Sequence, residues 1–72
     1  MSPGLPVVGG AEVIAALAKA GFVQVSQRGS HVRLRVDGRT IIVPMHRELA
    51  TGSLSSLLRQ AGLTTSEFIA LL

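Results

Sequence analysis

The residues best suited to chemistry lie in segment 29–36, which reads Gly-Ser-His followed by Val-Arg-Leu-Arg-Val. Side chains along an extended strand alternate between its two faces, so His31, Arg33 and Arg35 share one face and the aliphatic residues share the other. Residues two apart on one face lie about 7 Å from each other, which lets two guanidiniums hold successive phosphates while an imidazole reaches the backbone between them. The segment therefore predicts a strand with one apolar face and one cationic face that is suited to RNA.

His31 is the candidate acid or base of this face. An imidazole exchanges protons near neutral pH, and RNA supplies its own nucleophile in the 2′-hydroxyl, so one histidine beside phosphate-binding arginines can support strand cleavage without a metal. The alternative is a surface histidine that at most donates a hydrogen bond to a phosphate, and spacing alone favours that plainer role. The residues by themselves leave both roles open.

The neighbouring cations could extend the same surface. Arg33 and Arg35 are candidates for clamping phosphates, and Arg28 precedes the Gly-Ser-His turn. Exposed strand arginines also serve as solvated residues that discourage aggregation, and for Lys19 and Arg39 we favour that reading.

A second pair of candidates, His46 and Arg47, follows the last apolar strand pattern. A loop histidine there could bring a second proton carrier beside His31, although such a residue is more often simply polar. We therefore treat His46 and Arg47 as secondary RNA-binding candidates.

Other site chemistries are poorly supported. Ser30 and His31 are adjacent and would point to opposite faces of a strand, so Ser30 is better suited to shaping the turn than to acting as a nucleophile. The four acidic residues are scattered along the chain, and the chain has no cysteine, so neither a two-metal nuclease centre nor a thiolate zinc site is expected. We expect no metal and no small-molecule cofactor.

Composition limits the class of protein. The chain has 72 residues, enough for one domain with a modest core, and a formal net charge of +3 carried mainly by arginine, which favours phosphate-bearing partners. Its 47% of hydrophobic residues suggests apolar surface covered by a partner or by a second copy of the chain. No stretch resembles a leader or a membrane span, and we expect a cytoplasmic protein with a flexible arm over residues 1–10 and a domain over 11–72.

The periodicity predicts an α+β fold with the order α-β-β-β-α and a short extra C-terminal helix. The expected elements are a helix at 11–20, strands at 22–26, 31–36 and 39–43, a helix capped by Thr51 or Ser53 and ending at Gly62, and a last helix opened by a capping box from Thr64 to Glu67. Asp37-Gly38 is typical of a two-residue type I′ hairpin, so the strands should form an antiparallel sheet. Helices would cover one face and leave the His31 face open.

The order and spacing of several short motifs resemble the HicA family of bacterial toxins over about residues 11–72. These motifs lie at 21–22, 29–31, 37–39, 43–44, 52–54 and 58–63. The resemblance implies a double-stranded-RNA-binding-domain-like fold, an mRNA interferase activity that arrests translation, and neutralisation by a HicB-type antitoxin protein. It also implies that His31 is the catalytic residue and that Gly29 and Ser30 form its supporting turn.

Two questions stay open from the sequence. The partner of His31 in proton transfer could be His46, water or the RNA itself. The chain could also be a non-catalytic RNA-binding module or a protein-interaction module on the same scaffold, and product formation would separate these from a nuclease.

Overall fold

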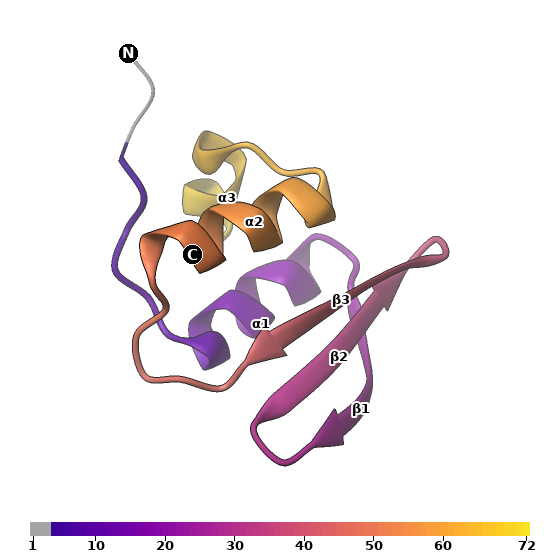
Figure 1. Ribbon diagram of the computed structural model, residues 1–72. Helices are drawn as coiled ribbons and strands as arrows, with labels where there is room; N and C mark the ends of the chain where they lie inside the picture. The colour runs from indigo at the N-terminus through magenta and orange to yellow at the C-terminus, as the bar shows by residue number, and fades with distance from the viewer. Residues whose placement is uncertain (1–3) are drawn as a thin grey trace.

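The computed structural model describes residues 4–72, and these form an α+β fold with the predicted element order. The elements are α1 (Gly10–Lys19), β1 (Val23–Arg28), β2 (His31–Val36), β3 (Arg39–Pro44), α2 (Thr51–Ala61) and α3 (Thr65–Leu71). The strands form one antiparallel sheet in the order β1-β2-β3, and the helices gather on one side of it (Figure 1). The other side of the sheet is left open.

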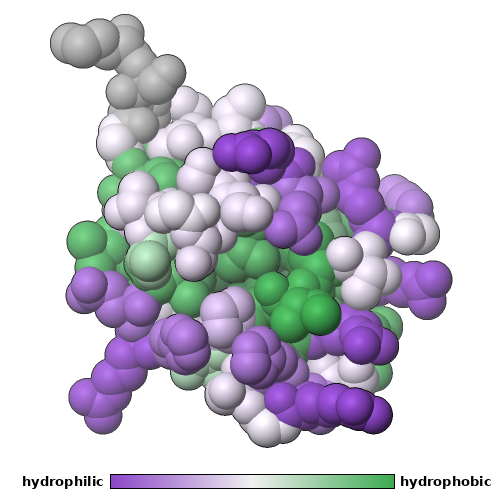
Figure 2. All heavy atoms as spheres, viewed as in Figure 1, coloured by the Kyte–Doolittle hydropathy of each residue, from purple (hydrophilic) through white to green (hydrophobic). Residues whose placement is uncertain are grey.

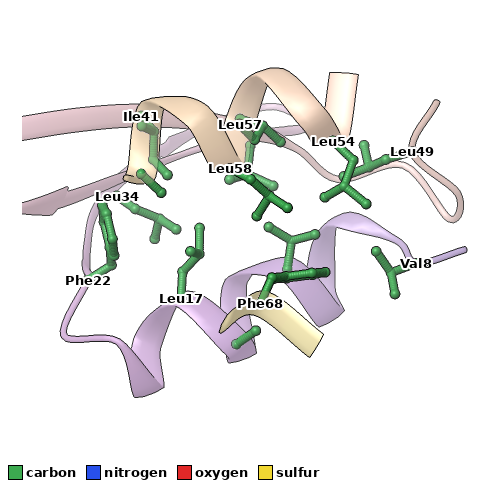
Figure 3. Close-up of a cluster of buried hydrophobic side chains, with 14 of the residues drawn as sticks. Val8, Leu17, Phe22, Leu34, Ile41, Leu49, Leu54, Leu57, Leu58 and Phe68 are labelled. Atoms are coloured by element: carbon green, nitrogen blue, oxygen red, sulfur yellow. The ribbon is translucent and has the colours of Figure 1, made fainter. Parts of the chain in front are cut away.

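The core lies between the helices and the inner face of β2 and β3. Val32 and Leu34 of β2 and Ile41 and Val43 of β3 are buried, while the residues between them are exposed. Figure 3 shows the helix side chains that meet them, among them Leu17, Leu54, Leu57, Leu58 and Phe68. Burying each such side chain contributes about 1.5–3 kcal/mol, so this alternation fixes which face of β2 is open.

The outer strand β1 is exposed along its whole length. Every residue from Val23 to Arg28 is solvent-accessible, and the strand lies at the edge of the sheet furthest from the helices (Figure 1). The register with β2 shifts between Gln24 and Ser26, which makes Val25 the extra residue of a β-bulge. The strand predicted at 22–26 is therefore misplaced, because Phe22 is buried in the core before the strand begins and the pairing continues to Arg28.

The helix ends confirm one predicted cap and correct another. At α3 the Glu67 amide donates to Thr64 Oγ1 at 3.1 Å, and the Thr64 amide donates to Glu67 Oε1 at 2.8 Å, which is the predicted capping box. At α2 the predicted cap at Thr51 or Ser53 is wrong, because Ala50 is the N-cap and provides no side-chain hydrogen bond. The extended backbone of Ala50 places its carbonyl to accept from the Leu54 amide, so the helix begins at Thr51.

Residues 8–10 belong to the packed part of the chain. Val8 is buried, and its carbonyl accepts a hydrogen bond from the Leu49 amide at 2.8 Å. The helix α1 begins at Gly10, before the predicted start at residue 11, with the Gly9 amide donating to Glu12 Oε1 at 3.1 Å. Residues 1–3 of the predicted flexible arm lie outside the described residues.

Within residues 4–72, no helix has the length and apolar character needed to cross a bilayer.

Candidate nucleic-acid interface

The Gly-Ser-His segment forms a tight turn at the end of the β1–β2 hairpin. Its two loop residues are Gly29 and Ser30, and Gly29 has a φ of 56°, as the first central residue of a type II′ turn requires. The strand expected at 22–26 ends too early, because Gln27 and Arg28 continue β1 as far as this turn. The Gln27 side chain donates through Nε2 to the Gly29 carbonyl at 3.0 Å and so braces the turn.

This turn brings Arg28 beside His31. The two residues are partners across the β1–β2 ladder, and Pro44 of β3 lies on the other side of His31. Side chains directly opposite in an antiparallel pair have Cβ atoms about 4.5–5.5 Å apart, so the side chains of Arg28 and His31 are neighbours on the open face. Both residues are exposed and accessible to a ligand.

The next row across the sheet holds Ser26, Arg33 and Ile42. Ser26 on β1 and Ile42 on β3 are both partners of Arg33. Residues two apart along a strand share a face, so this row stands beside the row of His31 on the same side of the sheet. The register thus assembles side chains from all three strands into one patch.

These two rows enclose a shallow hollow of about 230 Å³. Its lining residues are Ser26, Arg28, His31, Arg33 and Ile42. Arg28 and Arg33 provide planar, permanently charged donors for phosphate oxygens, and His31 provides a proton-exchanging group beside them. The hollow therefore brings together side chains that are able to bind a phosphate and a side chain that is able to exchange a proton.

The remaining predicted RNA-binding residues lie around the hollow rather than in it. Arg35 stands on the same face one row further along β2, opposite Val23 and Thr40. His46 and Arg47 are exposed on the loop that follows β3, and neither lines the hollow. This loop borders the turn, while Arg35 completes a basic strip on the open face, which consists of Arg28, His31, Arg33 and Arg35.

Backbone hydrogen bonds fix that loop against the turn. The Met45 amide donates to the Ser30 carbonyl at 2.6 Å, and the Gly10 amide donates to the His46 carbonyl at 2.9 Å. A Cβ atom at Gly10 would overlap the carbonyl oxygen of Pro44, so only glycine permits this approach. The start of α1 therefore holds the loop of His46 in a defined place near the turn.

The two cations that we assigned to solvated roles lie away from the hollow. Lys19 is exposed in the last turn of α1. Arg39 places its guanidinium beside Gly62, at the C-terminal end of α2, where a cation interacts favourably with the helix dipole.

The basic strip contains no acidic residue. The four carboxylate side chains of the chain lie on helices, in a turn or in a loop, at Glu12, Asp37, Glu48 and Glu67. Across the described part of the chain, no three carboxylate or imidazole groups converge as a metal-ligand cluster. Figure 2 shows hydrophilic residues along the lower and right margins of the molecule, where Figure 1 draws the strands.

Sequence reasoning missed three residues of this site. Ile42 could have been found, because a two-residue turn at 37–38 makes it the partner of Arg33. Ser26 closes the strand expected at 22–26, and its pairing with Arg33 follows only once β1 continues to Arg28 and the turn consists of Gly29 and Ser30 alone. Gln27 lies beyond the strand expected at 22–26, and only its place in β1 lets its side chain reach the Gly29 carbonyl.

The model of a family described as the HicA toxin of bacterial toxin-antitoxin systems matches residues 10–63. The chain belongs to the HicA toxin family. The matched segment contains α1, the whole sheet and α2, and therefore every residue of the hollow and its bordering loop. Membership of this HicA family implies a role as the toxin of a toxin-antitoxin pair and an antitoxin as partner. No curated protein matches the chain.

Proposed function

We propose that this HicA-family chain is an mRNA interferase, an endoribonuclease that arrests translation by cutting mRNA at the hollow on its open sheet face. The observation that carries the proposal is the placement of His31 with Arg28 and Arg33 around one hollow. An imidazole beside two guanidiniums joins the proton-transfer group and the phosphate ligands that RNA cleavage needs.

The reaction uses the nucleophile that RNA carries. A base removes the proton of a 2′-hydroxyl, the 2′-oxygen forms a bond to the adjacent phosphorus, and the bond from phosphorus to the 5′-oxygen breaks. The departing 5′-oxygen takes a proton from an acid. The products are a 2′,3′-cyclic phosphate and a 5′-hydroxyl, and the step consumes neither a metal ion nor a cofactor.

His31 performs one of these two proton transfers. His46, a water molecule or a group of the RNA performs the other, and the loop of His46 is held near the turn by the hydrogen bond from Met45 to Ser30. Arg28 and Arg33 stabilise the negative charge that develops on the phosphate oxygens, since guanidiniums bind such oxygens in a bidentate manner. Arg35 and Arg47 hold the flanking backbone by charge.

We further propose that a HicB-type antitoxin covers this face in the cytoplasm. The basic strip carries no carboxylate, so a partner that covers it must bring acidic groups to avoid leaving arginines unpaired. Such a cover would also exclude RNA from His31. Neutralisation and inhibition of cleavage would then be the same event.

The first test compares the parent chain with His31→Ala on total RNA in the presence of a chelator. We expect fragments from the parent only. Intact RNA from both proteins, with circular dichroism confirming that both are folded, would refute the nuclease and support a non-catalytic RNA-binding module. Binding without cleavage is the competing function. The observation that favours it is that His46, the second candidate for proton transfer, does not line the hollow.

A further inference from the structure

Ile42 lines the hollow, but its side chain has no group that can bind a phosphate or transfer a proton. Ile42 is the apolar member of a lining that is otherwise polar or cationic, and its side chain is 47% exposed. Single exposed aliphatic residues are ordinary on protein surfaces. Ile42 differs in that it forms part of the wall of the candidate catalytic hollow.

The position of Ile42 relative to His31 matches the dimensions of one nucleotide. Ile42 is the partner of Arg33, and Pro44 is the partner of His31, so Ile42 and His31 are diagonal neighbours on adjacent strands. Such neighbours lie about 7–8 Å apart. In a ribonucleotide the base and the 2′-hydroxyl are attached to adjacent ribose carbons, so a nucleotide with its 2′-hydroxyl at His31 can set its base against Ile42.

No phenylalanine, tyrosine or tryptophan ring is available to receive that base. The chain contains two phenylalanines and neither tryptophan nor tyrosine, and Phe22 and Phe68 are both buried in the core. Stacking on a phenylalanine, tyrosine or tryptophan ring, a usual way to hold an unpaired base, is therefore excluded, and the imidazole of the hollow, His31, is assigned to proton transfer. Arg28 and Arg33 are assigned to phosphate oxygens, so the exposed aliphatic side chain of Ile42 is the apolar group in the hollow that remains to contact the face of a base.

We propose that Ile42 forms a nucleobase subsite, on which the base of the nucleotide that supplies the attacking 2′-hydroxyl packs. This inference rests on the proposed ribonuclease function. The ligand is an unstacked, single-stranded nucleotide. Because an aliphatic contact reads no donor and acceptor pattern, the subsite positions the nucleotide for attack while accepting different bases.

An abasic substrate tests this directly. A short RNA is first mapped for its His31-dependent cleavage site, and a second RNA is made with an abasic ribonucleotide at the position 5′ to the cut, which keeps the ribose and its 2′-hydroxyl. Cleavage of both RNAs is measured as kcat/KM for the parent, for Ile42→Ala and for Val23→Ala. Val23 is the matched control, because it is 62% exposed on the same face but lies outside the hollow.

We expect the parent to cut the abasic RNA roughly threefold to tenfold less efficiently than the intact RNA, as removal of one apolar contact predicts. Ile42→Ala should show a similar decrease on intact RNA and no further decrease on abasic RNA, since the two changes remove the same contact. Val23→Ala should behave as the parent does on both. Ile42→Val, which keeps a branched side chain and the fold, should recover most of the activity.

Two results would overturn the subsite and leave the ribonuclease intact: unchanged cleavage of intact RNA by Ile42→Ala, or an equal decrease by that variant on both RNAs. Absence of His31-dependent cleavage by the parent would overturn the proposed function and this inference with it. The two failures are therefore distinguishable in one experiment.

Discussion

Arg28 and His31 are partners in the last rung of the β1–β2 ladder, separated by the two-residue turn of Gly29 and Ser30. The turn places the guanidinium of Arg28 on β1 beside the imidazole of His31 on β2. A phosphate-binding group and a proton-exchanging group therefore lie side by side. Arg33 then adds a second guanidinium from the following row of the same face. The three side chains are therefore the first targets for substitution.

Replacing His31 with alanine should abolish cleavage without unfolding the chain. The side chain is exposed, so the free energy of unfolding should change by less than about 0.5 kcal/mol, while removal of an acid or base costs about 10²–10⁴-fold in rate. Thermal unfolding and a single-turnover cleavage assay measure the two effects. Thr40→Ala, an exposed change elsewhere in the sheet, is the control, and a His31→Ala variant as active as the parent would remove His31 from the mechanism.

Removing Arg28 or Arg33 should weaken RNA binding in a salt-dependent way. Elimination of one phosphate contact to a single strand should reduce the slope of log K against log salt by about 0.7. Binding of single-stranded RNA to the His31→Ala protein, with and without each arginine, gives these slopes. Arg59→Ala, which removes an exposed arginine on α2, should leave the slope unchanged, and equal effects of all three would show that only net charge matters.

Two glycine-to-alanine substitutions should shift stability in opposite directions. Gly29 has a positive φ, and a Cβ atom added there would meet no other atom within 4 Å, so Gly29→Ala should cost about 1–2 kcal/mol through backbone strain alone. Gly52 lies in α2 with equally open surroundings and no positive φ, so Gly52→Ala should stabilise by about 0.5–1 kcal/mol. Urea denaturation measures both, and a neutral Gly29→Ala would contradict the assigned turn.

Gly10→Ala should be the most damaging of these single substitutions. The added methyl group would overlap the Pro44 carbonyl at a buried position, so α1 and the loop after β3 must separate. We expect the free energy of unfolding to fall by more than about 2 kcal/mol, together with reduced cleavage by the protein that stays folded. Gly4→Ala, which meets no neighbour, should have no effect on thermal stability.

Local signals explain which parts of the fold the sequence predicts well. The strand at 31–36 follows from strict alternation, the Asp37-Gly38 turn from a dipeptide that accepts the positive φ values of 44° and 81°, and the box at Thr64 from a short-range hydrogen-bond pattern. Each depends on residues within a few positions of one another. In each of these segments, tertiary packing stabilises the same local structure that the short-range pattern predicts.

Features that depend on distant contacts are not predictable in the same way. The bulge at Val25 and the extension of β1 to Arg28 depend on pairing with β2, and the extension, which leaves only Gly29 and Ser30 in the turn, places Ser26 opposite Arg33 in the hollow. The packing of residues 8–10 depends on the loop after β3, far along the chain, so a Gly-Gly pair by itself indicates only a flexible boundary. In both cases the decisive partner lies on another element.

The most direct test of His31 as the catalytic group is the chemical nature of the ends made by the parent chain and by His31→Ala on one defined RNA with a chelator present. Mass spectrometry should find 2′,3′-cyclic phosphate and 5′-hydroxyl ends from the parent and no cleavage by the variant, because the 2′-hydroxyl attacks with help from His31. Products with 5′-phosphate ends, or the same products from both proteins, would contradict the assignment of His31 and its hollow as the site of cleavage.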